Sequence, residues 1–147
     1  MERDSLAGIR GWLLVYIIGS IPVLLFYAAG LSGWFFEYPI GLMLAIFLLL
    51  ASPLLLILLK SSEAPQWNIA ALWIGSILLT VRVMYGVLFQ RIQEGRPPLS
   101  SAELLGAMPT LLGIVIVSLG WATVWTKYFK KSVRVSNTFY QKVSDTK

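Results

Sequence analysis

The chain has 147 residues, 57 % of them hydrophobic and only 13 % charged, and its mean hydropathy is +0.75. A folded soluble domain of this length still exposes about a third of the surface of its unfolded chain to water. A chain this apolar cannot cover that surface with polar residues, so a soluble domain is excluded. The sequence contains no Cys and no His, so disulfides, thiolate nucleophiles and imidazole metal ligands are excluded too. This composition indicates a single-domain integral membrane protein, and we expect no cofactor.

Four apolar segments are each long enough to span the hydrocarbon core of a bilayer, which takes about 20 helical residues. They cover residues 11–30, 39–59, 68–89 and 104–125, and short polar links join them. The first is longer than the apolar core of a signal peptide, so we expect it to remain as a helix. The sequence therefore predicts an all-α fold, a four-span transmembrane helical bundle with a basic juxtamembrane tail over residues 126–147.

Lys and Arg residues are distributed unevenly between the two sides of this predicted bundle. Only Arg91 and Arg96, in the third link, fall on one side. Nine fall on the side that holds both chain ends: Arg3, Arg10, Lys60, Lys127, Lys130, Lys131, Arg134, Lys142 and Lys147. Because cytoplasmic segments carry an excess of Lys and Arg, this distribution predicts that both termini are cytoplasmic.

Small residues within the spans indicate how the helices pack, because they let helix backbones approach closely. Each of the last three spans carries such a stripe: Gly41, Ala45 and Ser52; Ala71 and Gly75; and Gly106, Gly113 and Gly120. We expect these stripes to pack inside a compact antiparallel bundle, and the alternative is that they dock the helix of a partner.

Proline and tryptophan residues mark further features of the spans. Each proline inside a span removes a backbone hydrogen bond and is expected to bend its helix: Pro22, Pro53 and Pro109. Several tryptophans fall near predicted membrane interfaces, where amphipathic rings prefer to lie: Trp12, Trp34, Trp67, Trp121 and Trp125.

Arg82 is the only ionisable residue deep inside a predicted span, about 4–5 Å beyond its midpoint. Placing an Arg near the centre of a bilayer costs about 2.5–3.5 kcal/mol, so such a residue is a functional candidate. Arg82 shares a helix face with Gly75 and Tyr85, and we expect it to point into the bundle. In the alternative interpretation, it extends outward and pairs with Glu37 or Glu103.

The spans contain no Asp and no Glu, which argues against a proton-coupled transporter or a cation channel. Ser and Thr residues in the spans have no base nearby in the sequence, so we expect no enzymatic activity. In the third link, Ser100 and Glu103 have the spacing of a capping box at the start of the fourth span.

The segment from Trp125 to Phe139, "WTKYFKKSVRVSNTF", is basic and contains no acidic residue. Each Lys or Arg near an anionic leaflet contributes about 1 kcal/mol of attraction. The aromatic and apolar residues of the segment suit contact with lipid headgroups. We therefore expect the tail to lie along anionic lipids, and we expect no nucleic-acid partner because topology already explains the charge.

The tail also carries a sequence pattern, which we call the tail signature: Trp125, Tyr128, Phe129, Ser132, Arg134, Val135, Asn137, Thr138 and Phe139. It resembles the C-terminal signature of the small bacterial membrane family known as domain of unknown function 2569. The opening "GIRGWLLV" is similar to that family's Gly-Gly-Trp-Leu start, with Arg10 in place of the first glycine. The resemblance implies an inner-membrane protein of this size and assigns no activity. We further expect Arg134, Asn137 and Thr138 to clamp the tail onto the bundle.

Two functions fit these observations. The leading one is a small non-catalytic accessory protein of a bacterial inner membrane, which contacts a membrane-protein partner or forms a homodimer. Its interior would be dry, with Arg82 paired to Glu37 or Glu103. The alternative is a binding or transport module for a small or lipidic anion, with Arg82 in a wet cleft lined by Tyr85 and Thr80.

Overall fold

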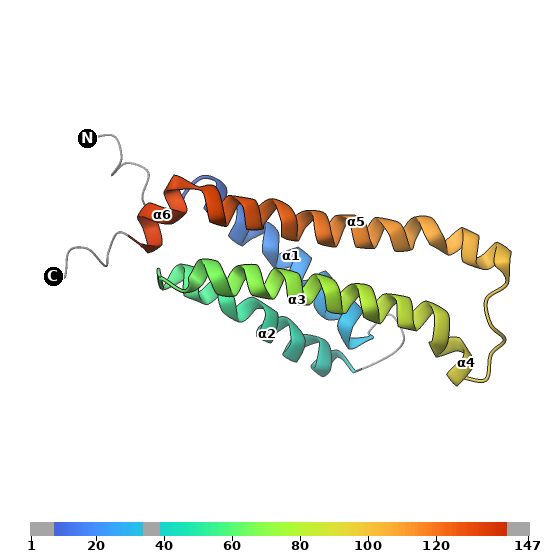
Figure 1. Cartoon of the computed structure of the whole chain (residues 1–147). Helices are drawn as coiled ribbons and strands as arrows, with labels where there is room; N and C mark the ends of the chain where they lie inside the picture. The colour runs from blue at the N-terminus through green and yellow to red at the C-terminus, as the bar shows by residue number, and fades with distance from the viewer. Residues whose placement is uncertain (1–7, 34–38, 141–147) are drawn as a thin grey trace.

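The structure, a computed structural model, describes residues 8–33 and 39–140 (Figure 1). Within these residues, four helices are long and apolar enough to cross a membrane. They are α1 (Trp12–Ser32), α2 (Ile40–Leu58), α3 with the π-helical turn that continues it (Ala64–Gln90), and α5 (Ser101–Lys131). The predicted all-α transmembrane bundle is therefore confirmed.

The third span consists of α3 (Ala64–Tyr85) and the π-helical turn Gly86–Gln90. Two short helices complete the described structure: α4 (Arg91–Gln93) and α6 (Val133–Phe139). The first three spans begin and end within a few residues of the predicted limits. The fourth differs more, because α5 continues as a helix to Lys131, well into the predicted tail.

Local chemistry explains several helix ends. Gly33 ends α1 in a left-handed conformation with φ 71°, which favours glycine. Pro65 occupies the first turn of α3, where a missing N–H removes no helical bond. At α5, Ser100 Oγ accepts from the Glu103 amide and Ser100 N donates to Glu103 Oε2 at 2.9 Å. The predicted capping box is therefore confirmed.

α3 is the central helix of the bundle. It packs against α1, α2 and α5, and α1 also packs along α2 (Figure 1). The start of α1, the α2–α3 turn, the end of α5 and α6 lie at one end of the bundle, and α4 lies at the other (Figure 1). This arrangement agrees with an even number of spans.

Glycines play two different roles in this packing. Gly75 on α3 is buried against Tyr27 of α1, and Gly19 on α1 lies against Trp121 of α5. A Cβ atom added at certain other glycines would meet no atom within 4 Å: Gly41, Gly106, Gly113 and Gly120. Ala45 and Ser52 are exposed as well. Our prediction that the α2 and α5 stripes pack inside the bundle is therefore wrong, because α3 contacts α5 through other residues, such as Ser118 and Thr126.

Pro53 is accommodated inside α2 by its neighbour. Its missing N–H leaves the Leu49 carbonyl without the usual helical donor. Ser52 Oγ donates to that carbonyl at 2.7 Å, so the carbonyl is satisfied within the helix.

Candidate functional site

The tail signature packs onto the start of the bundle. Trp125 and Phe129 on α5 contact Tyr16 of α1, with ring centroids 4.9 and 4.8 Å from the Tyr16 ring. All three side chains are buried. Trp125 is thus a core residue, whereas Trp12 and Trp67 are more than half exposed.

α6 folds back against this aromatic cluster. Ser132 caps its start, because Ser132 Oγ accepts from Val135 N at 3.5 Å. Val135 and Phe139 are buried in the same hydrophobic core as Tyr16. The apolar residues of the tail up to Phe139 are therefore docked on the bundle, and contact between the tail and anionic lipids stays a prediction. The expectation for residues 141–147 lies outside the described residues.

Thr138 ties α6 to the beginning of α1. Its Oγ1 accepts from Gly8 N at 2.9 Å and donates to the Arg134 carbonyl at 2.7 Å. A clamp between the tail and the bundle was predicted, and Thr138 supplies its hydrogen bond. Arg134 contributes only its backbone carbonyl to this contact, and Asn137 is half-buried beside it.

The end of the bundle that holds α6 is strongly basic, and we call it the basic end. Its described cationic residues are Arg10, Lys60, Lys127, Lys130, Lys131 and Arg134. In the same part of the described chain, Glu63 is the only acidic residue, and its Oε2 accepts from Trp67 Nε1 at 3.2 Å. Such a surface attracts anionic headgroups.

At the opposite end of the bundle, Arg82 is half-buried and donates from Nη1 and Nη2 to Gln90 Oε1, at 3.3 and 3.4 Å. Gln90 Nε2 donates in turn to Glu94 Oε1 at 3.1 Å, and Glu94 pairs with Arg96 at 3.7 Å. Residues eight apart in a straight α-helix differ by about 80° in direction. The π-helical turn between them brings Gln90 onto the Arg82 side. The described hydrogen bonds of the Arg82 guanidinium thus run along the helix to Gln90, and its orientation toward the bundle interior stays a prediction.

Tyr85 and Thr80, which we predicted beside Arg82, make their described hydrogen bonds with other residues. Tyr85 is half exposed, stacks on Phe89 with ring centroids 5.7 Å apart, and accepts from Gln93 Nε2 at 2.7 Å. Thr80 Oγ1 donates to the Ser76 carbonyl. The hydrogen bonds described for Glu103 run to Ser100, and Glu37 lies outside the described residues.

Two buried polar networks hold the helices together, and sequence reasoning did not single them out. In the first, Tyr16 OH donates to Asn68 Oδ1 at 3.0 Å. Asn68 Nδ2 donates to the carbonyls of Pro53 and Ala64, at 2.7 and 2.8 Å. Asn68 thereby joins α1, α2 and α3. The sequence feature that could have identified it is an amide side chain at the edge of an apolar span, where a polar group without a hydrogen-bond partner is costly.

The second network lies farther from the α6 end of the bundle, near the middle of α3. Tyr27 OH is 3.0 Å from Ser76 Oγ and donates to the Ser118 carbonyl at 3.2 Å. Ser76 Oγ lies 3.1 Å from the same carbonyl. These contacts join α1, α3 and α5. We expected Ser76 and Ser118 to hydrogen-bond within their own helix or to a neighbour, and Ser76 Oγ does both, through the Leu72 and Ser118 carbonyls.

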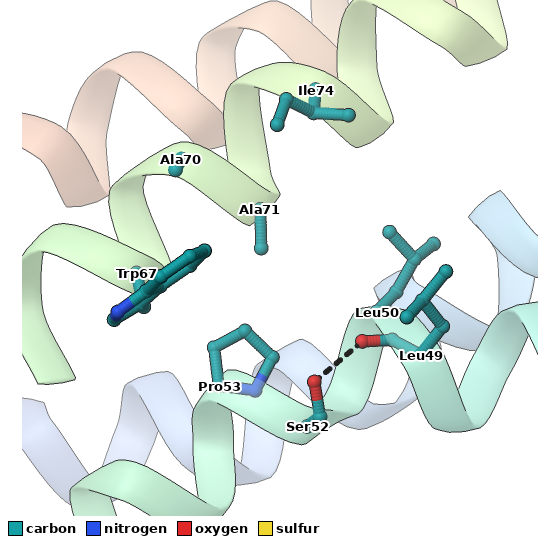
Figure 2. A pocket seen from close by; sticks show the side chains of 8 residues that line it. All are labelled: Leu49, Leu50, Ser52, Pro53, Trp67, Ala70, Ala71 and Ile74. Atoms are coloured by element: carbon teal, nitrogen blue, oxygen red, sulfur yellow. Dashed lines mark hydrogen bonds between the residues drawn. The ribbon is translucent and has the colours of Figure 1, made fainter.

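Two apolar grooves open between helices in the described part of the chain. Figure 2 shows the first, which has a volume of about 230 Å³ and opens between α2 and α3. Its walls are Leu49, Leu50, Ser52 and Pro53 on one side and Trp67, Ala70, Ala71 and Ile74 on the other (Figure 2). The second groove, of about 310 Å³, lies between α1 and α5: Pro22, Val23, Phe26, Tyr27, Val117 and Ser118. Neither groove is lined by a charged side chain, so both suit hydrocarbon and not an ion.

Comparison with known proteins gives no relative from which a role could be transferred. No family model, no curated protein and no solved structure matches this chain. Among residues 8–33 and 39–140, no group of acidic side chains is arranged to hold a metal ion. The candidate surfaces are therefore the basic end, the two grooves and the exposed side of α5.

Proposed function

We propose that this chain is a small, non-catalytic interaction protein of a bacterial inner membrane, which docks the transmembrane helix of a partner protein against α5. The observation that carries the proposal is the open glycine stripe of α5. Gly106, Gly113 and Gly120 repeat every seven residues on an exposed side of the helix. Each glycine in a helix interior costs about 1 kcal/mol relative to alanine. Lipid contact needs no glycine, whereas close approach of a second helix backbone does.

The burial of α5 supports the same proposal. Only 11 % of its most apolar window is buried, against 44 % for α1. At about 1.5 Å per residue its 31 residues extend about 46 Å, well beyond a hydrocarbon core of about 30 Å. α5 packs along α3 and leaves its outer side to the membrane. A long helix held along one side offers a partner a continuous surface.

The remaining parts of the proposal rest on the sequence. The absence of His and Cys supports a non-catalytic role. The excess of Lys and Arg at the basic end supports a cytoplasmic position for that end. The tail signature's resemblance to the bacterial family supports the inner membrane. Arg82, whose described contacts run to Gln90, gives the anion-transport alternative no specific support.

Site-specific photocrosslinking in the native membrane tests the proposal. A photoreactive residue at Thr110, on the stripe between Gly106 and Gly113, is expected to give one discrete protein adduct. The same residue at Ile18, 61 % exposed on α1 among large apolar side chains, is the matched control and should give only lipid adducts. Gly113→Ile should abolish the Thr110 adduct, because its side chain fills the space that the partner backbone needs.

The outcomes are distinct. Lipid adducts alone at both positions would overturn the docking proposal. An adduct unchanged by Gly113→Ile would show that the contact does not use the glycine stripe, and would overturn it as well. An adduct of twice the chain's mass would show that the helix docked on α5 belongs to a second copy of this chain, and would overturn the proposal of a separate partner protein.

A further inference from the structure

The groove between α2 and α3 (Figure 2) lies in the half of the bundle nearest the basic end. On α2 its wall reaches from Pro53 to Leu49, which lies about 14 Å from the end of the helix at Leu58, at 1.5 Å per residue. On α3 the wall reaches from Trp67 to Ile74, about 15 Å from the start of the helix. Half of a hydrocarbon core is also about 15 Å thick. The groove thus has the depth of one leaflet, whereas a transmembrane helix of a partner would extend past it.

The lining of this groove is suited to a hydrocarbon chain. The small side chains of Ala70 and Ala71 leave space between the two helices, and the larger ones of Trp67 and Leu49 border it (Figure 2). The hydroxyl of Ser52 already donates to the Leu49 carbonyl at 2.7 Å, within α2. A space of about 230 Å³ with no charged side chain in its lining favours an acyl chain over a polar ligand.

The turn that joins α2 to α3 lies at the basic end of the groove and carries two opposite charges, Lys60 and Glu63. Both side chains are exposed. Glu63 is held at the groove wall, because its Oε2 accepts from Trp67 Nε1 at 3.2 Å. An apolar groove with a cation and an anion at its end matches a lipid whose headgroup carries both a phosphate and an ammonium group.

Lys60 occupies a backbone position that favours glycine. It follows the end of α2 in a left-handed conformation with φ 53°. Its N–H donates to the Ile57 carbonyl at 3.0 Å, and the Ser61 N–H donates to the Leu56 carbonyl at 2.9 Å, which is the Schellman pattern. A Cβ atom is strained in this conformation. The lysine therefore brings its charge to the turn in spite of that strain, which favours a use for the ammonium group.

We propose that the α2–α3 groove binds one acyl chain of a phospholipid with a primary ammonium headgroup, whose phosphate contacts Lys60 and whose ammonium contacts Glu63. A lysine ammonium has three donors for phosphate oxygens, and the Glu63 carboxylate has a second oxygen besides the one that Trp67 uses. This inference goes beyond the proposed function, because the groove is separate from the stripe of α5 and needs no protein partner.

Native mass spectrometry of the delipidated protein in a neutral detergent tests the proposal. The probe is phosphatidylethanolamine, and phosphatidylcholine with the same acyl chains is the comparison. Phosphatidylethanolamine should bind at least about fivefold more tightly, because the trimethylated nitrogen of phosphatidylcholine cannot donate a hydrogen bond to Glu63. Equal affinities for the two lipids would overturn the proposal.

Glu63→Gln should remove this preference and leave the two affinities within about twofold of each other. The fold should be kept, because Glu63 is exposed and a glutamine oxygen can still accept from the Trp67 indole. Glu94→Gln is the matched control, since it makes the same change of charge at the opposite end of the bundle and should keep the preference. A preference that survives Glu63→Gln, or that is lost in both variants, would overturn the headgroup contact.

Ala71→Leu should weaken phosphatidylethanolamine by about tenfold or more, because the larger side chain fills the groove. Ala45→Leu, the same change at an exposed position of α2 outside the groove, should leave the affinity unchanged. Wild-type affinity in Ala71→Leu would overturn the groove as the site. If this variant is too unstable to titrate, the Glu63→Gln comparison still decides. None of these outcomes alters the Thr110 crosslink, so the two proposals can fail independently.

Discussion

The ring of Tyr27 lies directly against the backbone of Gly75, and a Cβ atom at Gly75 would stand only 2.9 Å from Tyr27 Cδ2. This contact lets α1 approach α3 closely enough for Tyr27 OH to reach Ser76 and the Ser118 carbonyl. A glycine and a tyrosine on neighbouring helices thus set the spacing at which three helices share one polar network.

Gly75→Ala is expected to destabilise the bundle by about 1–3 kcal/mol, because the added methyl group overlaps the Tyr27 ring. Thermal unfolding in detergent measures the effect. Gly106→Ala is the control, since a Cβ atom there meets nothing within 4 Å in the described structure. It should be neutral or stabilise by up to about 1 kcal/mol. Equal melting temperatures for the two variants would contradict the proposed packing.

Asn68→Leu should destabilise the protein by about 1–2 kcal/mol, because it leaves Tyr16 OH and the Pro53 carbonyl without their present partner. Adding Tyr16→Phe to Asn68→Leu should then cost less than Tyr16→Phe alone, since the hydroxyl has already lost its acceptor. A double-mutant cycle of unfolding free energies measures this coupling. Strict additivity would mean that the two side chains act independently.

Thr138→Val keeps the shape of the side chain and removes the oxygen that accepts from Gly8 N. A hydrogen bond of this kind contributes about 0.5–1.5 kcal/mol, so the Gly8 amide should exchange with solvent about two- to tenfold faster. Hydrogen-exchange mass spectrometry of the N-terminal peptide reads this directly. Ser136→Ala, an exposed position on the same helix, should leave the exchange rate unchanged.

Arg82→Leu is expected to insert into the membrane and accumulate normally, because leucine at this depth is favourable. Gln90→Leu should instead lower stability by about 1–3 kcal/mol, since it removes the acceptor of two Arg82 hydrogen bonds. Gln66→Leu serves as the control, since Gln66 is exposed in the first turn of α3 and undergoes the same change of side chain. Loss of accumulated Arg82→Leu protein would show that the arginine is needed for folding.

The predicted orientation can be read from single cysteines, because the chain has no Cys of its own. Ser62 in the α2–α3 turn and Pro98 in the α4–α5 link are both exposed. In intact cells, a membrane-impermeant maleimide should label Pro98→Cys and not Ser62→Cys. The reverse pattern would invert the topology.

The sequence was sufficient for the number of spans and for the limits of the first three, because run length and apolar character depend on single segments. It did not predict that α5 continues to Lys131. It was also sufficient for the Ser100–Glu103 cap, which involves neighbouring residues. It failed for the stripes, since nothing local distinguishes Gly75, which faces Tyr27, from Gly113, which faces open space.

The contacts of Arg82 could not be predicted from the sequence either. A regular helix wheel places it beside Gly75 and Tyr85, and on that basis we expected it to face inward. The π-helical turn that aligns it with Gln90 depends on backbone geometry that no residue pattern announces. For α6 the sequence predicted a clamp on the bundle but not the residue that it contacts. The amide that donates to Thr138 belongs to Gly8, 130 positions earlier, and no local pattern links the two.

That separation has a consequence for biogenesis. α1 enters the membrane early in synthesis, but Trp125, Phe129 and Thr138, which cover its first turns, emerge from the ribosome much later. Until α5 and α6 have been made, Tyr16 and the Gly8 amide lack these neighbours. Docking of the tail is therefore a late step of assembly, and the first turns of α1 reach their final packing only when almost the whole chain has been synthesised.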